Sequence, residues 1–293
     1  NLNDGTAKVF VIREIVEEVN FPSTEISLEE ARATNPDAEL GGTVEEVHNV
    51  TSFGRVAAQT AKQVLLQKLR EFERETMANE YGSKIGKIIT GTVIRVESRV
   101  IRLDLGHGEG IMPGSEQIPG ERLVTGSRIR ALLKNIDRDS NRGPTIILSR
   151  ADAQFVKLLF LQEVPEIETG TVEIKAIARE AGRRTKIAVY SSSSDIDPVG
   201  TFVGTKGVRV QAVMNEIGDT EKIDIITYDH DIRNYIANAL SPAEISRIDI
   251  NESDKTATVY VTEAQQSVAI GRQGQNVRLA SQLTGYDIDI VTE

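Results

Sequence analysis

Gly204-Thr205-Lys206-Gly207 and Gly271-Arg272-Gln273-Gly274 are two copies of a G-x-x-G tetrapeptide at an offset of 67 residues, from position 204 to position 271. A chain with 23 glycines is expected to contain about two such pairs by chance, so the tetrapeptide alone is weak evidence. The same offset also superposes Val210 on Val277 and Gly218 on Gly285. The loops are therefore parts of an internal repeat.

The residues around each loop follow one plan. Hydrophobic periodicity predicts, in each copy, a helix, a β-hairpin, a short helix, the glycine loop, another helix and a final strand. Gly218 and Gly285 are expected to end their helices in the left-handed conformation. The predicted elements are residues 151–162, 172–178, 185–190, 197–203, 208–217 and 222–227 in the first copy, and residues 231–240, 248–250, 256–261, 267–270, 275–284 and 286–291 in the second.

The chemistry of these loops fits RNA phosphates. Glycine at both ends lets the backbone turn sharply and approach a phosphate with no Cβ in the way, while the following helix directs unpaired N–H groups at the anion. The candidate RNA-binding residues are Gly204, Thr205, Lys206, Gly207, Val208 and Arg209 in the first copy, and Gly271, Arg272, Gln273, Gly274, Gln275, Asn276 and Arg278 in the second; Val203, Val210, Val213, Ile270 and Val277 are candidates for an apolar groove under the bases. A turn that needs glycine only for packing is the alternative.

Residues 84–150 predict a small β-barrel. Five short β-rich runs, at residues 88–96, 100–105, 110–112, 128–136 and 145–148, are separated by glycine and proline turns, as expected of a five-stranded OB-fold. This segment holds 12 basic and 7 acidic side chains and no Phe, Tyr or Trp on which bases could stack. We therefore expect attraction of the RNA backbone by a basic face made of Arg95, Arg99, Arg102, Arg128 and Arg130. A merely solvated basic face is the alternative.

Residues 1–83 predict a partial α/β domain. Strands and loops are expected up to residue 49, followed by a long amphipathic helix that starts at Arg55 and ends before Gly82. The first residues resemble a turn and include no initiator Met, so we expect the domain to be incomplete at its start. Packing of the helix on a small sheet is a simpler interpretation than a binding role.

Composition restricts the class of function. The chain has no Cys, and His48, His107 and His230 lie far apart, so we expect no metal site or disulfide. No apolar run approaches the roughly 18 to 20 residues of a membrane span, and the expected compartment is the cytoplasm. The net charge of −10 means that RNA capture in the acidic repeat must be local to the loops and groove.

Both copies of the repeat resemble KH domains of the bacterial type-II arrangement, which clamp about four nucleotides at the G-x-x-G loop. The whole chain resembles the NusA family of bacterial transcription factors. The segments that carry this resemblance are GRVAAQTAKQ (residues 54–63), GTV (91–93), QIPGE (117–121), ILSR (147–150) and SVAIGRQGQNVRLA (267–280).

The resemblance implies a multidomain α+β protein. The expected domains are a polymerase-binding domain at residues 1–83, the OB barrel at 84–150, and tandem type-II KH domains at 151–228 and 229–293. Such a protein is expected to be a monomer without cofactor or metal. It would bind RNA polymerase, single-stranded nascent RNA and other antitermination factors, and modulate pausing, termination and antitermination.

Two other classes of protein combine such domains or bind RNA through them. Phosphorolytic RNA-degrading enzymes also carry barrels and KH domains, but in the opposite order, and the sequence contains no P-loop, G-x-S-x-G or H-E-x-x-H motif. We therefore expect no enzymatic activity. A ribosome-associated KH protein is the second alternative, although such proteins tend to be strongly basic, unlike this chain.

Overall fold

The computed structural model describes residues 8–19, 21–49, 55–138, 144–218 and 220–293. Its contacts divide the chain into two units, residues 1–70 and 71–293, and helix α2 (Arg55–Gly82) runs across the division. Among the described residues, no helix combines the length and apolarity needed to cross a membrane.

The first unit contains a small three-stranded sheet. Its strands β1 (Lys8–Val16), β2 (Glu25–Ser27) and β3 (Thr43–Asn49) lie in the order β2-β1-β3, and helix α1 (Leu28–Thr34) follows β2 directly. The hydroxyl of Ser27 accepts a hydrogen bond from the Glu30 N–H and so caps α1. The core of this unit consists of small and aliphatic side chains: Ile15, Ile26, Ala31, Ala38 and Val44.

The second unit begins with a closed barrel, which confirms the five-stranded prediction. Its strands are β4 (Ile88–Val96), β5 (Val100–Asp104), β6 (Glu109–Pro113), β7 (Arg128–Asp137) and β8 (Thr145–Ser149), closed in the order β4-β5-β6-β8-β7, with a 3-10 turn at Gly114–Glu116. The last turns of α2 pack on this barrel. Tyr81 is 4% exposed there and donates a hydrogen bond from its hydroxyl to the Leu105 carbonyl at 2.9 Å.

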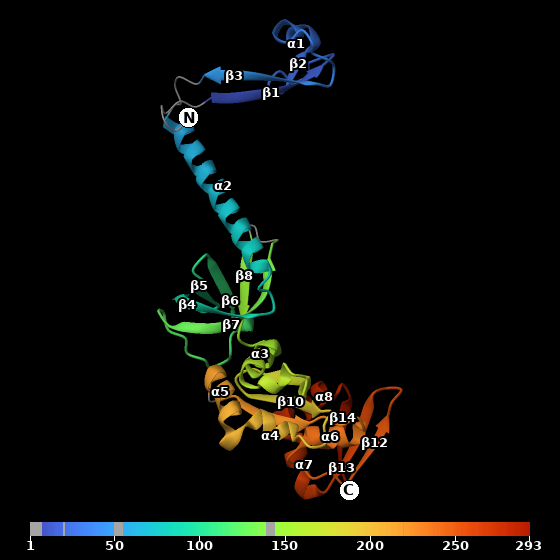
Figure 1. The fold of residues 1–293 in the computed structure, drawn as a ribbon. Coiled ribbons are helices and arrows are strands. Elements are labelled where there is room, and N and C mark those ends of the chain that lie inside the picture. The colour runs from blue at the N-terminus through green and yellow to red at the C-terminus, as the bar shows by residue number, and fades with distance from the viewer. Residues whose placement is uncertain (1–7, 20, 50–54, 139–143, 219) are drawn as a thin grey trace. The chain divides into compact units, whose positions relative to one another are not determined.

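Two domains of identical topology follow the barrel, which confirms the fold class. The first comprises α3 (Ala153–Glu163), a 3-10 turn (Pro165–Ile167), β9 (Val172–Glu180), β10 (Arg184–Ser191), α4 (Pro198–Val203), α5 (Val208–Ile217) and β11 (Lys222–Thr227). The second comprises α6 (Ile232–Leu240), β12 (Arg247–Asn251), β13 (Thr256–Val261), α7 (Glu263–Ile270), α8 (Gln275–Thr284) and β14 (Asp287–Thr292). In both sheets the middle strand is antiparallel to the first and parallel to the last. Figure 1 shows these domains in yellow to red.

The predicted helix cap at Gly218 is wrong, whereas that at Gly285 is confirmed. Gly285 has φ 74° and ψ 17°, the left-handed conformation. Gly218 has φ 98° but ψ 143°, a positive-φ conformation that favours glycine but lies outside the left-handed helical region. Its N–H still closes the helix on the Met214 carbonyl, and its own carbonyl accepts from the Glu221 N–H on the way into β11.

The sheet of the first KH domain is covered on both faces. Ile187 and Val189 of β10 face a core that includes α3, α4 and α5. Ala188, between them in sequence, faces the opposite way, where Ala176 and Ala178 of β9 join the core of the second KH domain. Side chains as small as alanine let helix α8 lie directly against β9 and β10. The first KH sheet therefore contributes to two cores, its own on one face and that of the second KH domain on the other.

A buried arginine joins the barrel to the first KH domain. Arg150 is 2% exposed. Its guanidinium donates to the carboxylates of Glu121 and Glu216 at 2.6 and 2.9 Å, and to the carbonyls of Glu216 and Arg130. Because five donors find partners on both sides of the joint, the burial of the charge is compensated.

We predict that Arg150→Ala destabilises the second unit by about 3–5 kcal/mol, because Glu121 and Glu216 would lose the buried charge that neutralises them. Urea unfolding of the 293-residue chain, followed by circular dichroism, measures this loss. Arg122→Ala is the matched control, since Arg122 is exposed, and should change stability by less than about 0.5 kcal/mol. Equal stability of the two variants would contradict the assigned role.

Candidate nucleic-acid interface

The two glycine loops have the same backbone conformation. Each is a 3-10 turn, Thr205–Gly207 and Arg272–Gly274. Lys206 has φ 55° and ψ 26°, and the equivalent Gln273 has φ 54° and ψ 31°. The flanking glycines also match: φ is 74° at Gly204 and 75° at Gly271, and 79° at Gly207 and 72° at Gly274. The repeat seen in the sequence is thus a repeat of one loop geometry.

Each loop presents its middle residues to solvent. Thr205 and Lys206 are exposed in the first loop, as are Arg272 and Gln273 in the second. Helices α5 and α8 begin immediately after the loops, and neither has a side chain that caps its first N–H groups. Main-chain donors and one cation therefore lie together at each loop, an arrangement suited to a phosphate.

The first glycine of each loop is needed for a second reason besides its positive φ. A Cβ on Gly271 would lie 2.8 Å from the Asn276 backbone N, and one on Gly204 would lie 2.8 Å from Cγ of Arg209. At Gly274 the nearest atom would be 3.9 Å away. The chain thus packs tightly against itself only at the first glycine.

Equivalent side chains hold both loops from within. Arg209 donates from Nη1 to the Thr201 carbonyl of α4 at 2.7 Å, and Asn276, 67 positions later, donates to the equivalent carbonyl of Val268 and to that of Ala269. Arg209 also pairs with Glu166 at 3.0 Å, which lowers the pKa of that carboxyl. The 1% exposure of Asn276 gives its side chain a structural role in place of the predicted RNA contact.

The second loop has an additional partner in the first KH domain. Arg278 donates to the Gln273 carbonyl at 3.1 Å and forms an ion pair with Glu180 at 2.6 Å. Gln275 donates to the same carboxylate at 2.8 Å. The bond from Arg278 is the main cause of a lowered pKa at Glu180. The sequence could not indicate Glu180 or Glu166, because each lies far along the chain from its partner.

A hollow of about 490 Å³ lies along β11. It is lined by Arg184, Val199, Asp224, Ile225, Ile226, Thr227, Asn238, Ser241 and Pro242. Beneath it, Lys186 is fully buried, with Nζ 3.4 Å from both the Asp224 carboxylate and the Ser241 carbonyl. Burial lowers the pKa of this lysine against the opposing effect of Asp224. Residues of the second KH domain thus complete the hollow.

The structure separates the five predicted groove residues into two groups. Val203, Val210, Ile270 and Val277 are half-buried, next to their loops. Val213 is only 1% exposed and lies in the core with Phe202 and Ile217, so it does not floor a groove as predicted. A helical position one turn beyond Val210 points into the domain because α5 packs against α3.

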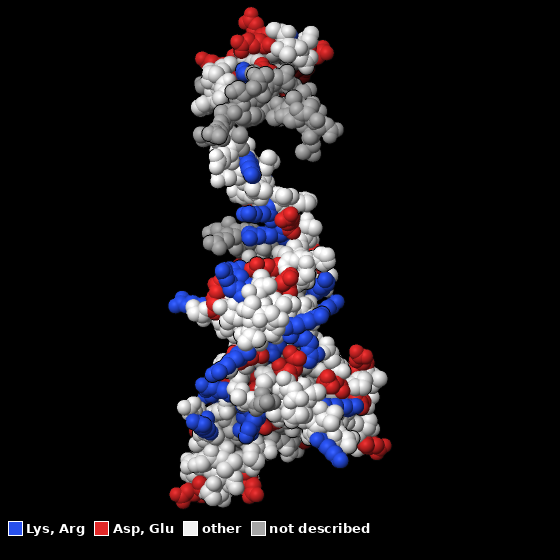
Figure 2. Space-filling view, turned by 90° about the vertical axis from the view of Figure 1, so that its left-hand side faces the viewer, with Lys and Arg blue, Asp and Glu red and all other residues white. Residues whose placement is uncertain are grey.

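Some arginines of the predicted basic face of the barrel are already paired with carboxylates of the protein. Arg95 and Arg102 are paired neighbours on β4 and β5, and Arg102 is bonded to Glu109. Arg130 donates to Glu216 and Gln162 of the first KH domain, so it serves the domain joint. Arg99 and Arg128 are exposed. Figure 2 shows Lys and Arg side chains over the barrel and the KH domains, with Asp and Glu among them.

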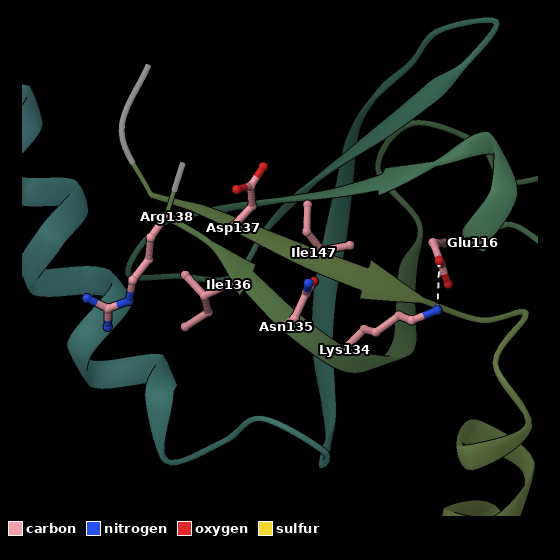
Figure 3. A pocket seen from close by; sticks show the side chains of 7 residues that line it. All are labelled: Glu116, Lys134, Asn135, Ile136, Asp137, Arg138 and Ile147. Atoms are coloured by element: carbon pink, nitrogen blue, oxygen red, sulfur yellow. Dashed lines mark hydrogen bonds and ion pairs between the residues drawn. The ribbon is translucent and has the colours of Figure 1, made fainter. Parts of the chain in front are cut away.

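A second hollow, of about 440 Å³, lies on strands β7 and β8 of the barrel. Figure 3 shows Lys134 directed at Glu116 at one end and Arg138 at the other. Lys134 Nζ is 2.8 Å from Glu116 and 3.2 Å from Asp152, and the bond to Glu116 raises the pKa of the lysine. Since these carboxylates balance its cation, this hollow is a poorer site for phosphate than the loops. Within the described part of the chain, no group of three or more His, Asp or Glu residues could hold a metal ion.

Family models match three parts of the chain. The NusA N-terminal domain matches residues 1–75, the NusA-like first KH domain residues 150–228, and the NusA-like second KH domain residues 232–293. The KH matches contain the two glycine loops described above.

Curated relatives cover almost the whole chain. The transcription termination/antitermination protein NusA of Thermus thermophilus is 47% identical over 287 residues, which are 98% of this chain and 74% of that protein. The NusA proteins of Halalkalibacterium halodurans and Bacillus subtilis are 45% and 44% identical over 293 residues, all of this chain and 76% and 78% of theirs. Among solved structures, APE1850 matches 45% of this chain and 96% of its own at 23% identity, with a TM-score of 0.34.

We predict that Gly271→Ala destabilises the chain more than Gly274→Ala. At Gly274, which is left-handed, alanine costs about 1–2 kcal/mol. Gly271, with φ 75° and ψ 173°, lies in a region that is almost exclusive to glycine, and only its Cβ would lie within 3 Å of backbone. Thermal unfolding of the two variants provides the comparison. A Gly274→Ala variant as unstable as Gly271→Ala would show that close packing at the first glycine is not needed.

Proposed function

The chain belongs to the NusA family of transcription termination/antitermination proteins, and from this membership we propose that it binds RNA polymerase and nascent single-stranded RNA, and so modulates pausing, termination and antitermination. It is an RNA-binding factor of transcription elongation and termination. The observation that carries the proposal is the pair of loops with one geometry, in two domains that pack against each other through a hydrophobic core to which both contribute.

The RNA would follow the two loops in turn. Each clamp holds about four nucleotides in domains of this kind. We propose that phosphates bind at Lys206 and Arg272 and at the N–H groups that follow them, with bases over the half-buried Val203, Val210, Ile270 and Val277. Binding at two sites fixed in one body gives avidity, because the second contact becomes intramolecular.

The barrel would attract the RNA backbone with less specificity. Arg99 and Arg128 are exposed, and Arg95 is exposed but lies 3.4 Å from the Glu97 carboxylate. Arg102 and Arg130 are more tightly paired with carboxylates. No Phe, Tyr or Trp occurs in residues 84–150, so stacking is not proposed. The contribution of the barrel should therefore depend strongly on salt.

The rest of the proposal follows the family. Residues 1–83 would contact RNA polymerase, the barrel would comprise residues 84–150, and the KH domains would comprise residues 151–228 and 229–293. Other antitermination factors would be further partners. The role is regulatory rather than catalytic, without cofactor or metal, for a monomer in the cytoplasm. Membership of the NusA family does not favour the ribosome-associated and RNA-decay alternatives.

We predict that replacing Thr205 and Lys206 by Asp, or Arg272 and Gln273 by Asp, weakens RNA binding at least about tenfold, or 1.4 kcal/mol. The new carboxylates would face phosphates at exposed positions and should not disturb the core. Fluorescence anisotropy with a random-sequence, unstructured RNA of about ten nucleotides measures this.

Glu252→Gln and Asp254→Asn together form a control, since both residues are exposed in the turn between β12 and β13. The control should bind RNA like the parent chain. Unchanged affinity in a folded clamp variant would reject that loop as a phosphate site.

The polymerase part of the proposal is tested by transcription. With purified bacterial RNA polymerase stalled at a defined pause, adding the chain should change the lifetime of the pause. The double clamp variant, with all four loop residues replaced by Asp, should have a smaller effect, because its hold on nascent RNA is lost. No change in pausing with a chain that binds RNA would refute the proposed link to polymerase and leave RNA binding intact.

A further inference from the structure

We propose that Glu180, the last residue of β9 beside the β9–β10 hairpin turn of the first KH domain, is a positioning residue for the RNA clamp of the second KH domain. The inference builds on the proposed RNA binding at Arg272–Gly274. It assigns control of the second clamp to a residue outside the second domain, which touches no RNA itself.

Glu180 holds the start of helix α8 with both carboxylate oxygens. Oε1 accepts from Arg278 Nε and lies 2.6 Å from Arg278 Nη2, while Oε2 accepts from Gln275 Nε2 at 2.8 Å. Gln275 and Arg278 are the first and fourth residues of α8, so they lie on one face of its first turn. That turn follows the clamp loop without an intervening residue.

Arg278 connects Glu180 to the loop. Its Nη1 donates at 3.1 Å to the carbonyl of Gln273, the loop residue with a left-handed backbone. Such a conformation is unfavourable for a non-glycine residue, and a bond to its carbonyl helps to maintain it. Because guanidinium is planar and rigid, fixing two of its nitrogens on Glu180 also fixes the third. Glu180 thereby orients the Gln273 peptide.

The hairpin turn is itself well fixed. The Gly182 N–H donates to the Glu221 carboxylate at 2.7 Å, and a Cβ on Gly182 would lie 2.6 Å from the Pro119 carbonyl of the barrel. Glu221 is fully buried and paired with Arg179, which is also bonded to the Arg150 carbonyl. The turn therefore presents Glu180 from a rigid joint between barrel and first KH domain.

The first clamp has no equivalent arrangement. The positions that correspond to Gln275 and Arg278 are Val208, which is 67% exposed, and Gln211, which bonds to Asn215 of its own helix. The effect of Glu180 should thus be confined to the second clamp. If Glu180 acted only through its charge, its removal should strengthen RNA binding, because a carboxylate near an RNA site repels phosphate. A positioning role predicts weaker binding instead.

The experiment measures RNA affinity of Glu180→Ala in three forms of the 293-residue chain. These are the parent chain, the chain with the first clamp disabled (Thr205→Asp, Lys206→Asp), and the chain with the second clamp disabled (Arg272→Asp, Gln273→Asp). The probe is the same random RNA pool. We expect a loss of about fivefold or more in the first two forms and none in the third. A gain in affinity, no change, or an equal loss in all three forms would overturn the proposal.

Arg278→Lys separates positioning from direct contact. Lysine keeps the positive charge but cannot bridge Glu180 and the Gln273 carbonyl with a rigid fork. We expect a loss similar to that of Glu180→Ala, and no further loss in the double variant. Full affinity in Arg278→Lys would show that Arg278 acts as a simple phosphate ligand. Glu173→Ala, at the far end of β9 and exposed, is the matched control and should bind normally.

Hydrogen exchange tests the inference without RNA. The Gly274 N–H bonds to the Gly271 carbonyl inside the second clamp, and the Gly207 N–H bonds equivalently to Gly204 in the first. Glu180→Ala should accelerate exchange at Gly274 and leave Gly207 unchanged. If the parent chain fails to bind RNA, the proposed function fails, and this measurement still decides whether Glu180 orders the second loop. Unchanged exchange at Gly274 would overturn the inference.

Discussion

The alanine face of the first KH sheet determines how the second unit is assembled. Ala176, Ala178 and Ala188 leave room for a helix of the second KH domain, while the other face of the same strands supports α3, α4 and α5. A sheet packed closely on both faces resists shifts against either layer. The two clamps therefore keep a fixed relation, and the barrel is tied to the same sheet through α3 and Arg150.

Several cations near the clamps and the barrel face already have an anionic partner in the protein. Arg102, Arg130, Arg209 and Arg278 each pair with a glutamate, and in two cases that glutamate belongs to a different domain. These charges fix geometry, so they cannot be counted in full toward counterion release on RNA binding. Attraction of phosphate is left to exposed residues and to main-chain N–H groups. This explains how an acidic chain with a net charge of −10 can bind RNA.

Local sequence patterns predicted the helices, strands and loops. They did not predict contacts or burial that depend on residues far apart in the chain. The loops, helices and strands of the repeat follow from glycine positions and hydrophobic periodicity, which act over a few residues. Glu180 and Glu216 could not be found in this way, because their partners lie 98 and 66 residues away. Val213 was misplaced for a related reason: its side of α5 is set by packing on α3, and a valine beside a glycine loop has the same pattern in a groove and in a core.

The two clamps have the same backbone conformation but are held in place by different residues. The first is held by Arg209 and Glu166, both from its own domain. The second is held by Asn276 from within and by Glu180 from the preceding domain. Contacts thus link the barrel joint to the first KH sheet, and the hairpin of that sheet to the second clamp. The geometry of the second clamp therefore depends on how the two KH domains are packed together.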